Sequence, residues 1–531
     1  MSDSKITRRR FLGQTAAAIA AAGLGQLPFR AEAEAMDEQK LAIKAKPNIV
    51  FIMGDDMGYA DLSCYGQRSY ITKNLDKLAK QGVLLTNHYS NSPVCSQTRV
   101  AFNTGRYQQR LPVGNMEPLF YSEDMGDPNN PDSPFNKIGI PGNYGTIATR
   151  LTQAGYHTAL YGKWHCGYSG ALNTFGPIKN GYEEFYGFLS GGVHHFTHKD
   201  DYDKRDLWNG ESPVDASENF GTYDTDLLTD KAVEFIRARK KDKTPFFLNL
   251  AYHSTHWPWL GPDDKDHPQN APYPFALEAF NYGAPDTYAK QVISLDDGVG
   301  KVLKALEATG LARNTIVVFV SDNGGERYSN VWPFIGSKGH LYEGGIRVPG
   351  IVRWPGVFPR NKKSAQVSIT MDWTATFLAA AGTSLDPADG PIDDGIDLTP
   401  ILMQAGSKNE ELQSRTLFWR FKGQHAVRDG NLKYLLMPES YVINVTDMPD
   451  PRHPFTPAGA DGDDEIGTEY LFDLSKDQRE QANQANSYIK KWIDPSAEPP
   501  AAFATLKEKF DEWNTEMLPE NSAALKLNAR M

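Results

Sequence analysis

Cysteine is the scarcest residue in this chain: 531 residues contain three, Cys64, Cys95 and Cys166. A chain of this length with three cysteines cannot depend on a disulfide framework for its stability. The core must therefore come from apolar packing, and 40% apolar with 23% charged residues is ordinary for a globular protein. The length predicts two packed subdomains rather than one core.

Positive charge is also in short supply. The chain has 55 Lys and Arg residues against 66 Asp and Glu residues, which gives a formal net charge of −11. Such a chain is a poor candidate for binding nucleic acid or anionic membranes. The same charge opposes a polyanionic substrate, so an anion must be attracted by a local basic site.

The N-terminal region lacks an apolar run long enough for a membrane span. Residues 16–27 are too few and too rich in alanine and glycine. They follow residues 7–12 (TRRRFL), typical of a twin-arginine signal, and precede residues 31–35 (AEAEA), which offer small-x-small cleavage sites. We therefore predict that residues 1–35 are a twin-arginine signal peptide. A basic tail before an amphipathic helix is the alternative.

Removal of this segment takes away five basic and three acidic side chains, so the formal charge becomes −11 − 2 = −13. The prediction is that a bacterium exports the folded protein to the periplasm or beyond. No membrane attachment is expected after cleavage.

Apolar, β-rich runs alternate with helical patterns through the first three quarters of the chain. Nearly continuous apolar strands separated by helices indicate an α/β fold, in which helices cover both faces of a large mixed sheet. The predicted strands are 48–53, 157–161, 245–252, 315–320 and 349–354. The predicted helices are 73–81, 145–154, 225–240, 285–309 and 372–381. We assign this first domain to residues 36–410.

The pattern changes from about residue 411. Short strand patterns with turns between them are followed by a helical pattern at 501–517. We predict a smaller C-terminal subdomain, residues 411–531, with an antiparallel sheet and a helix. Its predicted strands are 417–420, 425–428, 432–435 and 470–474. Residues 436–468 are rich in Pro, Asp and Gly and are predicted to be a long loop.

Two pairs of oxygen-bearing side chains, Asp55-Asp56 and Asp322-Asn323, each come just after a predicted strand. Taken singly, an Asp-Asp pair is usually solvated and Asp-Asn-Gly is usually a turn. Ligands of α/β sheets collect beyond the carboxyl ends of the strands. Hard oxygen ligands suit calcium, and magnesium tolerates similar ones. The two pairs together predict a metal site.

Further motifs lie at distant points of the sequence, and none is decisive alone. A cysteine four residues before an arginine at a helix start is ordinarily a buried thiol. Taken together and in order, the motifs closely resemble the type I, formylglycine-dependent sulfatases of the alkaline phosphatase superfamily. The motifs are 92–99 (SPVCSQTR), 104–107 (TGRY), 162–165 (GKWH), 253–258 (HSTHWP), 336–339 (GSKG) and 342–349 (YEGGIRVP). The resemblance spans nearly the whole mature chain.

The resemblance implies that a formylglycine-generating maturation enzyme oxidises Cys95. The hydrated aldehyde is a geminal diol, which supplies an oxygen nucleophile and later releases sulfate by collapsing back to the aldehyde. One diol oxygen binds the metal, which the resemblance identifies as a single calcium ion. Arg99 stabilises the diol. The implied metal ligands are Asp55, Asp56, Cys95, Asp322 and Asn323.

The resemblance also assigns two lysines and two histidines. Lys163 and Lys338 contact the sulfate, His165 acts on the diol hydroxyl, and His256 protonates the leaving alcohol. Lys163 and His165 alternate along a strand end, so their side chains can reach the same cleft. Taken singly, each would ordinarily be a surface lysine or a hydrogen-bonded histidine of the core.

One residue departs from the family motif, which normally has proline two residues after the cysteine. This chain has Gln97 there, while Thr98 and Arg99 conform. The departure bears on recognition by the maturation enzyme. It also motivates an alternative, an unmatured protein that only binds sulfated glycans. With Cys95 consumed, Cys64 and Cys166 are one disulfide or two buried thiols, and we favour the thiols.

Residues 191–198 (GGVHHFTH) carry three histidines at spacings that can bind zinc. No carboxylate or thiol near them in the sequence supports a zinc site. His194 and His195 are predicted to line the leaving-group pocket, with an ordinary loop as the alternative. His253, where the family more often has a small or amide residue, is predicted to contact the substrate.

The predicted function is hydrolysis of sulfate monoesters. Hydrolysis of phosphomonoesters or phosphonate esters is the alternative within the superfamily. Its phosphate-cleaving members carry histidine beside the second metal-binding aspartate, where this chain has Asn323. Export, 10 Trp and 24 Tyr residues, and the histidine-rich loop favour a sulfated polysaccharide or its oligosaccharides as substrate, because sugar rings stack on aromatic faces.

Overall fold

The structure is a computed structural model. It describes residues 45–111, 139–142, 144–167, 175–200, 205–215, 217–265, 283–389, 394–438, 468–480, 487–489 and 500–519. The predicted signal peptide and residues 439–467 of the predicted loop lie outside this part of the chain. No described helix combines the length and the apolarity that a membrane span requires.

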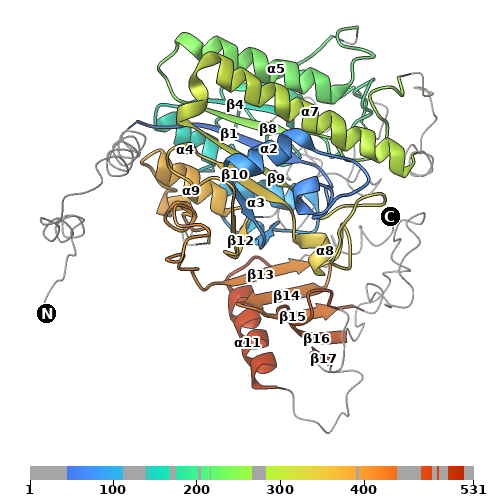
Figure 1. Cartoon of the computed structure of the whole chain (residues 1–531), viewed down its shortest axis with the longest axis vertical. Coiled ribbons are helices and arrows are strands. Elements are labelled where there is room, and N and C mark those ends of the chain that lie inside the picture. The colour runs from blue at the N-terminus through green and yellow to red at the C-terminus, as the bar shows by residue number, and fades with distance from the viewer. Residues whose placement is uncertain are drawn as a thin grey trace, which may run out of the picture.

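A ten-stranded mixed sheet forms the centre of the larger domain (Figure 1). The strand order is β11-β2-β10-β9-β1-β8-β4-β5-β6-β7. The five central strands β9, β1, β8, β4 and β5 run parallel, and β10 runs antiparallel to β9. The strand bounds are β1 (Asn48–Gly54), β2 (Val83–Leu85), β4 (His157–Lys163), β5 (Glu184–Phe188), β6 (Trp208–Asn209), β7 (Ser212–Pro213), β8 (Phe246–Ala251), β9 (Thr315–Ser321), β10 (Gly350–Arg353) and β11 (Lys362–Ser364). A separate pair joins β3 (His88–Tyr89) to β12 (Ser368–Ile369).

Alternate residues of each central strand pack on opposite faces of the sheet, because side chains along a strand alternate in direction. In β1, Phe51 packs with the helices α3, α4 and α9, whereas Ile52 packs with α2, α5 and α7. Both faces are therefore buried, which explains why the strand sequences are continuously apolar. The bounds of the α-helices are α2 (Lys73–Gln81), α3 (Cys95–Thr104), α4 (Ile147–Gln153), α5 (Asp224–Ala238), α7 (Pro285–Thr309), α8 (Glu343–Ile346), α9 (Asp372–Ala380), α10 (Thr399–Leu402) and α11 (Ala501–Thr515).

The C-terminal subdomain is an antiparallel sheet of five strands in the order β13-β14-β15-β16-β17, packed against α11 (Figure 1). The strand bounds are β13 (Thr416–Phe421), β14 (Gln424–Asp429), β15 (Leu432–Met437), β16 (Thr468–Asp473) and β17 (Ser487–Ile489). Its core is continuous with that of the larger domain, because Trp419 and Tyr434 belong to the same buried cluster as Tyr89 and Ile346.

A buried ionic network fastens this sheet to the larger domain. The Nζ of Lys433, on β15, lies 3.0 Å from a Glu343 oxygen and 2.7 Å from a Glu480 oxygen, and all three side chains are 0% exposed. Lys433 also donates to the backbone carbonyl of Leu341, three residues beyond Lys338. The C-terminal sheet therefore supports the segment that carries Lys338.

Replacing Lys433 by alanine is expected to destabilise the protein by about 3–5 kcal/mol, because it leaves the buried Glu480 carboxylate without its cation. The unfolding midpoint, followed by tryptophan fluorescence, measures the effect. Lys476→Ala is the control, since this lysine pairs with Asp473 while 64% exposed, and the midpoint should change little. Equal small shifts for both variants would contradict the role of Lys433.

The predicted fold class, an α/β fold with a large mixed sheet and a small C-terminal antiparallel sheet plus helix, is confirmed. The domain boundary at residue 411 stays a prediction; the C-terminal sheet begins at Thr416. Short strands at and near the sheet edges, such as β2 and β6, were not predicted, because two or three residues carry no periodic pattern. All three cysteines are free; Cys166 is buried and Cys64 is half-buried.

Candidate active site

The carboxyl ends of four neighbouring parallel strands gather the predicted site residues. The order β9-β1-β8-β4 places the segments that follow these strands side by side. In the register of β1 with β9, Gly54 lies opposite Ser321, so Asp55-Asp56 and Asp322-Asn323 emerge together. The Asp56 backbone N–H donates to Asp322 Oδ1 at 3.2 Å. All four side chains are buried.

Two oxygen atoms of this group are without hydrogen-bond donors among the described residues: Asp55 Oδ1 and Asn323 Oδ1. Burial, and then repulsion by Asp322, raises the pKa of Asp55 to about 8. Burial also opposes ionisation of Asp322, but Arg99 and Lys163 hold its pKa below the usual value. Unused, buried, hard oxygen atoms among three carboxylates fit a divalent cation such as calcium.

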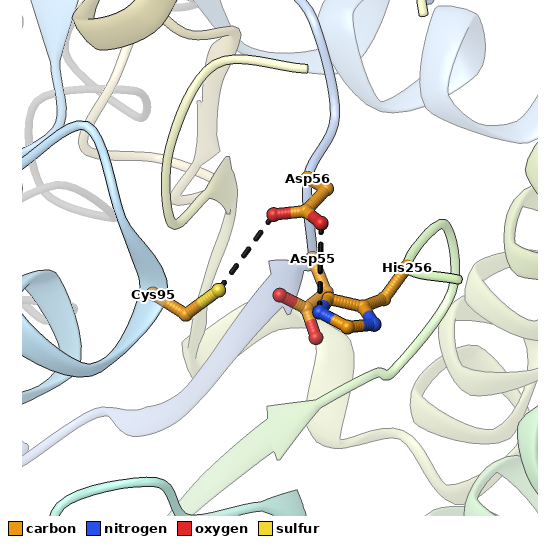
Figure 2. Close-up of side chains that lie close together, drawn as sticks. All are labelled: Asp55, Asp56, Cys95 and His256. Carbon is orange, nitrogen blue, oxygen red and sulfur yellow. Dashed lines mark hydrogen bonds and ion pairs between the residues drawn. The ribbon is translucent and has the colours of Figure 1, made fainter. Parts of the chain in front are cut away.

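Cys95 is the first residue of α3, and its thiol points at this group (Figure 2). The Sγ donates to Asp56 Oδ1 at 3.6 Å. Burial raises the pKa of the Cys95 thiol well above its usual value, despite the nearby charges of Lys163 and Lys338. A cysteine that acts as a thiolate nucleophile needs a lowered pKa. The unmodified side chain is therefore a poor nucleophile.

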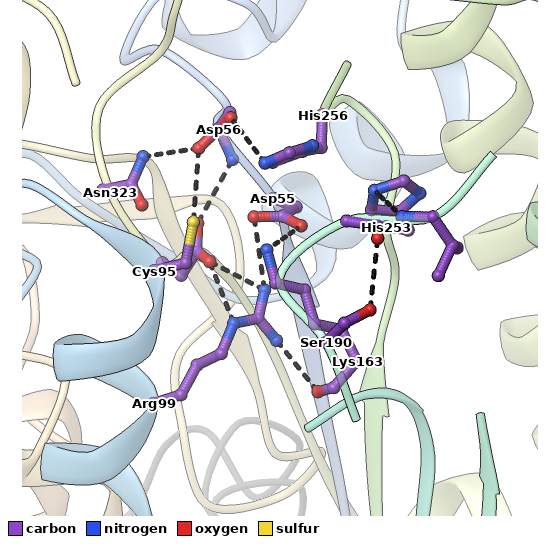
Figure 3. A network of polar contacts seen from close by, with 12 residues as sticks. Asp55, Asp56, Cys95, Arg99, Lys163, Ser190, His253, His256 and Asn323 are labelled. Carbon is purple, nitrogen blue, oxygen red and sulfur yellow. Dashed lines mark hydrogen bonds and ion pairs between the residues drawn. The ribbon is translucent and has the colours of Figure 1, made fainter. Parts of the chain in front are cut away.

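Arg99 lies one helical turn after Cys95 and ties α3 to the carboxylates (Figure 3). Its Nε and Nη2 donate to Asp322 Oδ2 at 3.0 and 2.7 Å, and Nη2 lies 3.5 Å from Asp55 Oδ1. The remaining Nη1 donates to the backbone carbonyl of Lys163. One guanidinium thus links β9, β1 and β4 at the site.

Gln97 is buried in the first turn of α3, and its Oε1 accepts a hydrogen bond from Ser92 Oγ. Thr98 Oγ1 accepts from the Ser92 backbone N–H at 3.0 Å. Both side chains therefore fix the turn before Cys95. Proline in place of Gln97 would leave Ser92 Oγ without this acceptor.

Lys163 and Lys338 each pair with one of the aspartates. Lys163 Nζ lies 2.7 Å from Asp55 Oδ2, and Lys338 Nζ lies 2.7 Å from Asp56 Oδ2. Lys163 is completely buried, and the Lys338 side chain is 18% exposed. Three cationic groups, with Arg99, therefore face three carboxylates in a chain whose net charge is negative.

His165 and His256 lie at the same group. His256 Nε2 is 3.6 Å from Asp56 Oδ2 (Figures 2 and 3), and its Nδ1 donates to the Trp257 backbone carbonyl at 2.6 Å. Neither ring nitrogen of His165 has a hydrogen-bond partner among the described residues. Burial, followed by nearby lysine charges, lowers the pKa of both rings well below the usual value. Both are therefore neutral in this arrangement.

The remaining predicted histidines, His194, His195 and His253, are also buried. His194 Nδ1 accepts from the backbone N–H groups of Phe196 and Thr197. His195 and His253 each pair with Asp224, at 2.9 and 3.1 Å. Their exposed fractions are 3% for His194 and 0% for the other two.

Comparison with known proteins agrees with this geometry. The sulfatase family model matches residues 47–383, which include every predicted catalytic and metal-binding residue. The chain belongs to the sulfatase family. Within the alkaline phosphatase-like superfamily, it is an arylsulfatase-like hydrolase.

The relatives of this sulfatase include N-acetylgalactosamine-6-sulfatase of Rattus norvegicus, which is 32% identical over 372 residues. That match covers 67% of this chain and 66% of the rat protein, so the chain spans just under two thirds of its length. The crystal structure of Ps i-CgsB is 26% identical with a TM-score of 0.68, over 91% of this chain and 98% of that one. The same figures hold for its complex with k-i-k-neocarrahexaose.

The sequence alone did not point to three residues near the site of this sulfatase. Glu326 Oε2 lies 3.8 Å from Lys338 Nζ, and burial raises the pKa of Glu326 to about 7. In the sequence, only the position of Glu326 between Asn323 and Lys338 could have indicated that it lies near the site. Asp224 and Gln291 are distant in the sequence from the histidines that they contact, so only the fold brings them together. Asp224 begins α5, where an acidic residue is ordinary for a helix start.

Proposed function

We propose that this sulfatase hydrolyses sulfate monoesters of a sulfated polysaccharide or of its oligosaccharides. The observation that carries the proposal is the convergence of Lys163, Lys338 and His256 on the two aspartates beside Cys95. The lysines supply local positive charge, which a sulfate group requires in a chain with net charge −11.

Formylglycine derived from Cys95 supplies the oxygen nucleophile in this proposal. The buried thiol, with its raised pKa, is unsuited to that task. His165 fits the role of the base that receives a proton from residue 95, because it is neutral and both of its ring nitrogens are unpaired among the described residues. The formylglycine-generating maturation enzyme is the implied partner.

The proposed metal site holds one calcium ion, which polarises the oxygens that it binds. Its residues are Asp55, Asp56, Asp322, Asn323 and residue 95. Arg99 keeps Asp322 ionised and fixed. Asn323 makes the ligand set one charge less negative than a fourth carboxylate would. Lys163 and Lys338, which now pair with the aspartates, are placed to turn toward a bound sulfate.

His256 is proposed to protonate the leaving alcohol. The lysine charges that lower its pKa are partly offset when a negatively charged sulfate ester lies between them. With Nδ1 donating to the Trp257 carbonyl, Nε2 is the nitrogen that faces the reacting group.

The carbohydrate substrate is supported by the relatives. The related Ps i-CgsB has been crystallised with k-i-k-neocarrahexaose, and the rat relative is named for a sulfated amino sugar. A twin-arginine signal, as predicted for residues 1–35, would direct a bacterial enzyme out of the cytoplasm, where it can meet polysaccharides. We therefore propose a periplasmic or secreted enzyme of polysaccharide breakdown.

Replacing His256 by alanine is expected to reduce kcat/KM on a sulfated sugar by about a hundred- to ten-thousand-fold, the usual contribution of general acid catalysis. The loss of kcat/KM on nitrophenyl sulfate should be much smaller, because nitrophenolate leaves without a proton. Lys338→Ala should lower kcat/KM on both substrates, because the lysine charge stabilises the sulfate group that both contain. Kinetics of both variants on both substrates provide the measurement.

His157→Ala is the matched histidine control. This residue begins β4, at the opposite end from Lys163, and pairs with Glu183 and Glu184. It should leave both activities unchanged. Equal losses on the two substrates for His256→Ala would remove His256 from the acid role.

A further inference from the structure

A second polar cluster lies behind His256, built from His195, Asp224 and His253. The Asp224 carboxylate accepts hydrogen bonds from Nδ1 of His195 at 2.9 Å and from Nδ1 of His253 at 3.1 Å. The three side chains are at most 1% exposed, so the cluster is closed to solvent. The predicted contacts of His195 and His253 with the substrate stay predictions.

The hydrogen bond at the far side of the His253 ring fixes where its proton is. His253 Nε2 accepts from the Val193 backbone N–H at 3.4 Å. A ring nitrogen that accepts carries no proton, so neutral His253 holds its proton on Nδ1, facing Asp224. The Nδ1 of His195 faces the same carboxylate, while its Nε2 lies 2.9 Å from the Gln291 side-chain nitrogen and 3.4 Å from the His256 backbone carbonyl. Burial also lowers the pKa of His253 to about 4, which agrees with a neutral ring.

The Nδ1 atoms of both histidines therefore have the Asp224 carboxylate as their acceptor without any ion. The same three ligand atoms lie close enough together to hold a metal. A metal would need both Nδ1 atoms free of protons, and would displace the two hydrogen bonds that now satisfy Asp224. The arrangement is explained more simply as a rigid hydrogen-bonded unit.

The unit contacts His256 through the His253 ring, through His195 Nε2, which lies 3.4 Å from the His256 backbone carbonyl, and through Gln291. The rings of His253 and His256 lie 5.0 Å apart at 31° (Figure 3). The backbone carbonyl of His256 accepts from the Gln291 amide at 3.3 Å, the same amide that holds His195. A Cβ built on Gly192 would lie 3.0 Å from His256 Cε1 and 3.7 Å from His253 Nε2, so the backbone at Gly192 lies close to both rings.

We propose that the His195–Asp224–His253 unit is a positioning device for His256. It holds the imidazole so that Nε2 faces the leaving oxygen, and it acts through His256 rather than on the substrate. This inference rests on the acid role of His256 given under the proposed function. Its consequence is that Asp224 influences catalysis selectively, according to how much the leaving group needs a proton.

Asp224→Asn is the direct test. An amide offers one acceptor oxygen and one NH₂ group, so one of the two histidines loses its acceptor and must turn or move its proton to Nε2. We expect the loss of kcat/KM on a sulfated sugar to exceed the loss on nitrophenyl sulfate by about ten- to a hundred-fold, the scale of a small misplacement of a reacting group. In a His256→Ala background the same change should add little, because the group that it positions is gone.

A second pair of variants covers the case in which Asp224→Asn does not fold. His253→Asn keeps an N–H that can donate to Asp224 in place of Nδ1, whereas His253→Ala keeps none. His253→Asn should retain more activity on the sulfated sugar than His253→Ala, with little difference on nitrophenyl sulfate. Asp296→Asn is the control, because Asp296 is a buried carboxylate that accepts from the backbone N–H groups of Asn74 and Leu75 at the start of α2. Any change of kcat/KM in this control variant should be the same on both substrates.

Three results would overturn the inference. The first is an equal loss on both substrates for Asp224→Asn, or for the His253 pair. The second is a full additional loss in the His256→Ala background. The third is a stoichiometric transition metal in the wild-type protein that Asp224→Asn removes. Failure of the proposed function looks different, since His256→Ala itself would then show no dependence on the leaving group, and that outcome overturns both.

Discussion

Replacing Cys95 by alanine is expected to lower kcat/KM on sulfate esters by about 10⁴- to 10⁶-fold, the scale found when an enzyme loses its nucleophile. The variant keeps the carboxylates, the lysines and His256, but no group at position 95 can be converted to an aldehyde or supply the attacking oxygen. Because Cys95 is buried in a well-formed helix, the smaller side chain should leave the fold intact. Steady-state kinetics and circular dichroism measure the two effects.

Cys64→Ala is the matched control, since Cys64 is a half-buried free thiol that lies outside the site. It should keep its activity. Mass spectrometry of the peptide containing residue 95, from the native host, should show the lower mass expected when the thiol becomes an aldehyde. Active enzyme that contains only unmodified cysteine at this position would refute the mechanism.

Removing calcium is expected to reduce activity to background, and adding calcium should restore it. Without a metal ion, Asp55 Oδ1 and Asn323 Oδ1 remain buried with no hydrogen-bond donor among the described residues. Calcium binding should also raise the unfolding temperature, because a ligand at a hundred times its Kd stabilises the folded state by about 2.7 kcal/mol. Thermal unfolding across a calcium titration gives a readout that does not depend on maturation of Cys95.

Asn323→Ala removes one proposed oxygen ligand without changing the charge. It should raise the calcium concentration needed for half of the thermal shift by at least about tenfold. Asp226→Asn is the control, because Asp226 pairs with Lys301 at the exposed surface and should leave the titration unchanged. Full activity of a rigorously metal-free preparation would contradict the calcium site.

The buried centre of the fold was predictable because its signal is local. The strand β1 and the helix α7 were predicted to within a residue or two, since each carries a continuous or periodic apolar pattern over its whole length. The strand β5 was not predicted, although it lies in the parallel part of the sheet. Its charged first residue and internal glycine obscure the pattern, and its pairing with β4 decides its conformation.

The sequence by itself predicted the residues whose chemical type the proposed reaction requires: the cysteine, the oxygen ligands, the lysines and His256. Each stands in a short motif at a strand or helix end, so its role can be inferred before the fold is known. Only the tertiary structure decided how Asp224 pairs with His195 and His253, each 29 residues away, and how Gln291 meets His195 across 96 residues. Hydrogen bonds between side chains so far apart in the chain are set by how strands and helices pack. No local pattern encodes that packing, and the environment that orients His256 could not be deduced from the sequence.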